Sequence, residues 1–163
     1  DEKILEEKEI VLLKSTGHNK VFRSAIETWK MQPITGFGLK SYRLKCPEIF
    51  VNDKILRERN PLLFACGNHP HNYYLEVLSE AGIIGLILIV IFFITLLKKS
   101  IKCLLKYNKE SNKNFLILLA LTVTFFIEIW PIKSTGSFFT TWNATALWLN
   151  VGIIYSFIYY KKK

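Results

Sequence analysis

The chain has 163 residues, of which 50% are hydrophobic and 14% aromatic, and its formal net charge is +9. Its length would allow one soluble domain of roughly 150 residues, but the apolar residues gather in three long blocks after Gly82. Ten lysines against two glutamates after Glu80 account for +8 of the charge. Because these lysines flank the apolar blocks, they indicate membrane topology and exclude a surface that follows nucleic-acid phosphates.

The first segment, Asp1–Lys14, mixes charged and apolar residues at near-helical spacing, which predicts a short amphipathic helix. It has no hydrophobic stretch of a signal peptide, and a start inside a helix without methionine suggests the C-terminal part of a longer protein. A second helix should be capped by Asn19 and end before Pro33, because the residue before proline avoids the helical region. We expect its apolar face to consist of Val21, Phe22, Ala25, Ile26 and Trp29.

The next part of the chain lacks periodicity. Gly36–Gly38 predicts a tight turn, and Leu39–Gly67 predicts a long loop, because prolines, an Asn-Asp pair and charges interrupt it. Cys46 and Cys66 lie in this loop and would close a ring of about 20 residues, so that a disulfide would stabilise the protein by about 3 kcal/mol. The two thiols could equally remain unpaired, and we expect the pair. Cys103 lies among lysines and should remain a thiol.

Three apolar segments of 17 residues follow: Ala81–Leu97, Phe115–Pro131 and Ala144–Tyr160. At 1.5 Å per residue each is about 26 Å long, at the short end of what crosses a hydrocarbon core of about 30 Å. Helices buried in a soluble bundle would carry polar stripes, whereas Phe115–Ile127 contains only two threonines. The fold class predicted is an all-α membrane protein with three transmembrane helices.

The lysines also predict the orientation in the membrane. The link at 98–113 contains six lysines and one glutamate, and the chain ends in Lys161–Lys163. Both should be cytoplasmic. Residues 1–80 then form a periplasmic loop region with short helices, and residues 81–163 form the three membrane helices, in the inner membrane of a bacterium.

Polar, titratable residues stand where the periplasmic region meets the first apolar segment: His69, His71, Asn72 and Glu76. An imidazole with a pKa near 6.5 accepts a proton at neutral pH, so His71 is a candidate general base. The plain alternative is a solvated or capping histidine. A metal site is a further alternative, but zinc sites on helices place histidines four residues apart. We expect neither a metal nor another cofactor.

Two motifs resemble a known family. His71-Asn72, nine further residues and Gly82-Ile83-Ile84-Gly85 resemble the His-Asn-x9-Gly-x-x-Gly pattern of the O-antigen ligase family, and more broadly the shared C-terminal region of O-antigen ligases and polymerases. Upstream, Arg23, Trp29 and Pro33–Gly38 are similar to the family's Arg…Trp…Pro-x-x-Gly-x-Gly signature. Each motif alone is weak, but their order ahead of apolar helices is fairly specific.

This resemblance implies a membrane glycosyltransferase of the C type, with a helical periplasmic loop above the bilayer. The donor would be an undecaprenyl diphosphate-linked glycan, and the acceptor hydroxyl would belong to lipid A–core in ligases or to another lipid-linked glycan in polymerases. By position, His71 matches the histidine proposed to deprotonate the acceptor, and Arg23 matches an arginine thought to hold the diphosphate. His69 and Asn72 would help to bind substrate groups.

The remaining candidates depend on residue type alone. Without the resemblance, Arg23 would be an exposed arginine paired with Glu27. Arg43 is a possible diphosphate or sugar contact, as are Arg57 and Arg59, and His18 is treated as a surface residue. Glu128 is the acid within an apolar segment, where carboxylates are functional candidates, although Lys133 could pair with it.

Transfer chemistry requires Arg23 and His71 to converge on one cavity at the outer membrane face. The competing class is a transporter or flippase fragment that binds glycans without transferring them. Such a protein would instead carry polar groups through the middle of its membrane helices.

Overall fold

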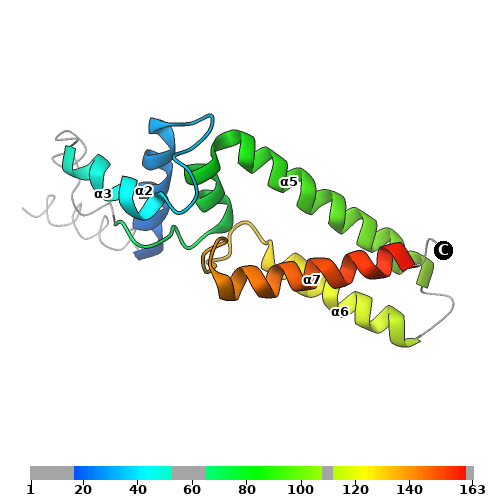
Figure 1. Cartoon of the computed structure of the whole chain (residues 1–163). Helices are drawn as coiled ribbons and strands as arrows, with labels where there is room; N and C mark the ends of the chain where they lie inside the picture. The colour runs from blue at the N-terminus through cyan, green and yellow to red at the C-terminus, as the bar shows by residue number, and fades with distance from the viewer. Residues whose placement is uncertain (1–16, 53–64, 108–111, 161–163) are drawn as a thin grey trace, which may run out of the picture.

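The computed structural model describes residues 17–52, 65–107 and 112–160, and within these ranges the regular structure is all helical. The helix predicted over Asp1–Lys14 lies outside the described residues. The helices are α2 (Gly17–Met31), α3 (Tyr42–Asn52), α5 (Tyr73–Tyr107), α6 (Asn112–Glu128) and α7 (Thr141–Tyr160). Figure 1 shows α2 and α3 packed at one end of α5, while α6 and α7 lie along its length. The predicted all-α class is confirmed.

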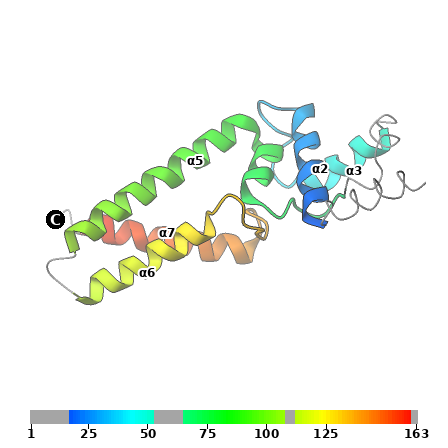
Figure 2. The same ribbon diagram turned by 180° about the vertical axis from the view of Figure 1, so that it is seen from behind.

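Helices α5, α6 and α7 form an up-down-up bundle, as both views show (Figure 2). Its core contains Phe93, Phe125 and Ile154, which are at most 2% exposed. The hydroxyls of Ser100 and Thr122 lie 2.5 Å apart and join α5 to α6. By length and apolar composition α5 can cross a membrane, and no other described helix meets both criteria. The expectation that α6 and α7 also span therefore remains a prediction.

Helix α2 differs from its prediction at its start and on its buried face. It begins at Gly17, so Asn19 lies inside its first turn and not at the cap. Ala25 is buried as expected, but Ile26 is 36% exposed, and Ser24 and Thr28 are the other fully buried side chains. Their hydroxyls donate to the carbonyls of Lys20 and Ser24 one turn earlier, at 2.9 and 2.8 Å. Because these hydroxyls are satisfied within the helix, they can be buried.

The predicted loop contains a helix. Residues 42–52 form α3, with Pro47 inside it. The carboxylate of Glu80 accepts hydrogen bonds from the backbone N–H groups of Lys40 and Tyr42, at 2.5 and 3.4 Å, and so stabilises the start of α3. Cys46 is bonded to Cys66, with Cα atoms 5.8 Å apart, which joins α3 to the segment just ahead of the histidines.

Helix α5 begins at Tyr73, ahead of the predicted Ala81, and continues to Tyr107 through the lysines that we assigned to a link. It is interrupted at Gly82, where φ is 67° and ψ is −169°. The turn over Pro33–Gly38 docks into this kink. There Ile83 N–H donates to Pro33 O at 2.9 Å, and Gly38 N–H donates to Glu80 O at 2.8 Å.

The docked turn replaces the helical hydrogen bonds that the kink removes. Two more backbone bonds complete the joint, from Ile84 N–H to Ile34 O at 3.4 Å and from Phe37 N–H to Ser79 O at 3.2 Å. A Cβ on Gly82 would lie 2.2 Å from Ile34 O, and one on Gly36 would lie 2.4 Å from Glu80 C. The two motifs therefore interlock through backbone contacts at which only glycine fits.

Candidate active site

His71 lies in the turn immediately before α5 and has a left-handed backbone, with φ of 54°. This region is uncommon for residues other than glycine, although histidine tolerates it better than most. The conformation is held by Thr135, whose backbone N–H donates to the carbonyl of His71 at 2.8 Å. Thr135 belongs to the segment between α6 and α7, so a part of the chain that is distant in sequence holds the backbone of His71. Nothing in the sequence pattern indicated this contact.

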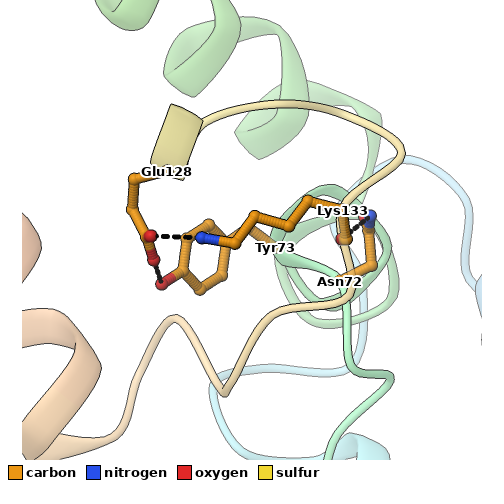
Figure 3. Close-up of polar contacts among 4 residues, drawn as sticks. All are labelled: Asn72, Tyr73, Glu128 and Lys133. Carbon is orange, nitrogen blue, oxygen red and sulfur yellow. Dashed lines mark hydrogen bonds and ion pairs between the residues drawn. The ribbon is translucent and has the colours of Figure 1, made fainter. Parts of the chain in front are cut away.

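Asn72 caps α5 and binds the same segment. Its Oδ1 accepts hydrogen bonds from the N–H groups of Tyr74 and Leu75, at 3.0 and 3.2 Å. Its Nδ2 donates to the carbonyl of Pro131 at 2.8 Å. It also donates to the carbonyl of Lys133 at 3.3 Å (Figure 3). The side chain is buried, and both ends of the amide are occupied. Both the oxygen and the nitrogen of this amide are bonded to the protein, and the predicted role of Asn72 in substrate binding stays a prediction.

Glu76 adds a second attachment one turn later. Its carboxylate accepts hydrogen bonds from Ser137 Oγ at 2.5 Å and from Phe138 N–H at 2.6 Å. Glu76 is 2% exposed, so these bonds are shielded from water. Asn72, Glu76 and the carbonyl of His71 therefore hold residues 131–138 over the start of α5.

Three imidazoles meet at this surface. The ring centroids of His69 and His71 are 4.3 Å apart, and those of His18 and His71 are 5.7 Å apart. Burial lowers the pKa of His71 below its ordinary value of 6.5, and the charges of His69 and His18 lower it further. Burial also lowers the pKa of His69, whose Nε2 has no hydrogen-bond partner among the described residues. The cluster therefore favours a neutral, proton-accepting His71 at pH 7.

His18 was missed as a site residue. It is exposed, as the sequence suggested, but it stands at the start of α2 with its Nδ1 3.5 Å from Ser134 Oγ. The sequence offers no signal that His18 lies beside Ser134 and His71, because these residues are 116 and 53 positions further along the chain.

Glu128 takes part in a partly exposed network beside the cap. Its carboxylate pairs with Lys133 Nζ at 2.5 Å, as the sequence suggested, and accepts a hydrogen bond from the hydroxyl of Tyr73, also at 2.5 Å (Figure 3). Tyr73 was not a predicted site residue. Through these contacts Glu128 joins the end of α6 to the first residue of α5. A direct part for Glu128 in the reaction stays a prediction.

Within the described residues, no hydrogen bond or ion pair joins Arg23 to His71. At about 100° per residue, Arg23 points about 140° around α2 from His18, on the face opposite Ser24, Ala25 and Thr28. Arg23 is exposed and pairs with no described carboxylate, since Glu27 pairs with Lys30 at 2.7 Å. The convergence of the Arg23 guanidinium and the His71 imidazole on one cavity stays a prediction.

Arg43 is an exposed residue of α3, and Arg57 and Arg59 lie outside the described residues. In the described ranges, no group of three or more histidines, cysteines or acids is arranged to hold a metal ion.

Comparison with known proteins agrees with this arrangement. Residues 16–90 match the family model Wzy_C, described as O-antigen ligase, and these residues include α2, the interlocked turn, the histidines and the kink. The chain is 31% identical over 116 residues to the exopolysaccharide production protein ExoQ of Rhizobium meliloti (strain 1021), covering 70% of this chain and 26% of that protein. No solved structure matches significantly. The predicted resemblance is thus confirmed: residues 16–90 of the chain match the O-antigen ligase family.

Proposed function

We propose that the protein is a membrane glycosyltransferase that moves a glycan from undecaprenyl diphosphate to a hydroxyl acceptor at the periplasmic face of the inner membrane. One observation carries this proposal: a half-buried imidazole, His71, is held at the mouth of the candidate membrane helix by residues from three separate segments. The family match over residues 16–90 supports the same class of reaction.

The surface of the bundle supports three membrane spans. Large apolar side chains are exposed on all three helices, including Ile87, Leu88, Ile91, Leu116, Ile117, Val123, Leu149 and Ile153. Water-soluble proteins rarely expose so extensive an apolar surface. With the lysines of 98–106 on the cytoplasmic side, His71 and the helices before it face the periplasm.

In the proposed step, the neutral imidazole of His71 accepts the proton of the acceptor hydroxyl. The hydroxyl oxygen attacks the anomeric carbon of the glycan, and the bond from that carbon to the carrier diphosphate breaks. The diphosphate leaves with the electron pair, so a cation is needed beside it. We assign this task to Arg23, with Arg43 as a second candidate. Because no described contact joins Arg23 to the histidines, its part is tested separately.

Two acceptors are compatible with this chemistry. The family description, O-antigen ligase, favours lipid A–core. The relative's name, exopolysaccharide production protein, favours a polymer-forming reaction in which a second lipid-linked glycan accepts. A transporter is less well supported, because the buried hydroxyls of Ser100 and Thr122 bond to each other and do not line a path.

The test is complementation by the whole gene product in ligase-null and polymerase-null strains, followed by electrophoresis of the lipopolysaccharide. A ligase restores glycan on lipid A–core, and a polymerase restores the ladder of chain lengths. His71→Gln should abolish rescue at unchanged membrane abundance, and Arg23→Gln should reduce it, whereas Lys30→Gln, on the same helix, should not. Rescue that survives both His71→Gln and Arg23→Gln would refute the assigned roles.

A further inference from the structure

A second polar feature lies at the opposite end of the bundle, where α5 and α7 end side by side in both views (Figures 1 and 2). A cavity of about 360 Å³ opens there between the two helices. Helix α5 contributes its charged wall, with Lys99, Lys102 and Lys106. Helix α7 contributes its largely aromatic wall, with Tyr155, Ile158 and Tyr159. Nothing in the proposed transfer reaction uses this cavity.

The three lysines form a concentrated positive site. Their spacing of three and four residues places Lys99, Lys102 and Lys106 within about 60° on one face of α5. All three are exposed. No carboxylate belongs to the described residues of α5 after Glu80, of α6 before Glu128, or of α7, so these charges have no acidic neighbour on the helices that surround them.

The position along α5 corresponds to a membrane surface. Residues 81–97 contain no charged side chain, and the 17 residues from Gly82 to Lys99 extend about 26 Å at 1.5 Å each. A hydrocarbon core is about 30 Å thick, so a kink at one interface places the lysines in the headgroup layer of the other. Tyr155 and Tyr159 are half exposed or more, as is typical of aromatic residues at that depth.

We propose that this cavity binds the headgroup of an anionic phospholipid of the cytoplasmic leaflet, with the phosphate held by the three lysine ammonium groups and the tyrosine hydroxyls. The apolar part of the wall, at Ile158, would contact the start of an acyl chain, which a soluble anion lacks. Basic cavities between membrane helices on this side suit such lipids. The inference depends on α5 crossing the bilayer and not on glycan transfer, so failure of the transfer assay leaves it standing.

The test uses the whole gene product in a non-ionic detergent, with bound lipid measured by native mass spectrometry and the thermal midpoint measured during titration. Phosphatidylglycerol should bind and raise the midpoint, while phosphatidylcholine of the same acyl chains should do neither. The double variant Lys102→Gln/Lys106→Gln should bind phosphatidylglycerol about 30-fold more weakly, from about fivefold per lysine. Lys98→Gln/Lys113→Gln removes the same charge on the same side outside the cavity, and should bind as the wild type does.

Two further measurements, one on a variant that retains the charge and one with inorganic phosphate alone, keep the result interpretable. Lys102→Arg/Lys106→Arg retains both charges and should retain binding, which separates loss of charge from loss of folding. Three outcomes would overturn the proposal: no preference for phosphatidylglycerol, an equal loss in the Lys98/Lys113 variant, or the same stabilisation by inorganic phosphate alone. The last outcome would identify a site for soluble anions.

Discussion

The joint between the Pro33–Gly38 turn and the kink of α5 makes Gly82 a sensitive position. In Gly82→Ala, the new Cβ would lie 2.2 Å from Ile34 O and 2.4 Å from Ile34 C. These are backbone atoms, so no flexible side chain can move aside, and the turn itself has to retreat. Retreat would break the backbone hydrogen bonds that replace the helical ones at the kink.

The expected loss of unfolding free energy in Gly82→Ala follows from two separate effects. At φ of 67° and ψ of −169° the backbone of residue 82 lies in a region essentially restricted to glycine, which costs about 1–3 kcal/mol for a residue with a Cβ. Overpacking at a close contact costs about 1–3 kcal/mol more, so the free energy of unfolding should fall by about 2–6 kcal/mol. Gly38→Ala isolates the first effect, since Gly38 has φ of +98° but no atom within 4 Å of a Cβ. Gly152→Ala, within α7 and in open space, should be neutral or stabilising by up to about 1 kcal/mol.

The assay is thermal unfolding of the whole gene product in detergent, with each variant compared at equal protein and lipid content. We expect the midpoint to be highest for Gly152→Ala and the wild type, lower for Gly38→Ala and lowest for Gly82→Ala. Transfer activity should also fall in Gly82→Ala, because the histidine turn stands on the helix segment that the joint anchors. An equal midpoint for Gly82→Ala and Gly38→Ala would show that the interlock contributes nothing beyond backbone strain.

Four other predictions concern the histidine turn and the disulfide just ahead of it. Because the pKa of His71 is lowered in the folded protein, transfer should lose activity on acidification only below pH 6.5, as measured by the acid limb of kcat/KM. His69→Asn removes one of the charges that lower the pKa of His71. It should therefore move the acid limb of kcat/KM upward, toward pH 6.5. Cys46→Ser/Cys66→Ser should lower the unfolding free energy by about 3 kcal/mol, and a reducing agent should do the same to the wild type alone. Asn72→Ala should lower kcat with little change in KM, whereas a substrate-binding role would raise KM.

The features predicted correctly from the sequence depend on local chemistry. Pro33 ends α2, and the glycines at 36 and 38 adopt positive φ, because proline and glycine restrict or widen the backbone directly. The apolar run after Gly82 forms a helix that is long and apolar enough to cross a membrane, as its composition predicted. The pairing of Glu128 with Lys133 follows from their closeness in the chain.

The features missed depend on contacts between distant segments. Helix α3 was predicted as loop because Pro47 interrupts it, yet the Glu80 carboxylate at its start and the bond from Cys46 to Cys66 hold it in place. His18 reaches His71 only because α2 packs against the start of α5. The buried face of α2 was predicted from hydrophobicity alone. In the structure Ser24 and Thr28, whose hydroxyls bond within the helix, are buried, and Ile26 is exposed.

The nine-residue spacing between His71-Asn72 and Gly82 sets the geometry of the site. The nine residues between Asn72 and Gly82 form a helix segment of about 13.5 Å, which sets the height of His71 above the kink. Within it, Glu76 holds residues 137–138 and Glu80 holds the start of α3. The two carboxylates are four residues apart, so they lie about 40° apart around the helix. One inserted residue would rotate one end by about 100° relative to the other and detach one of these carboxylates. The spacing of the motif therefore sets the distance and the rotation of the His71 turn relative to the kink at Gly82. The glycines fix the position of the kink.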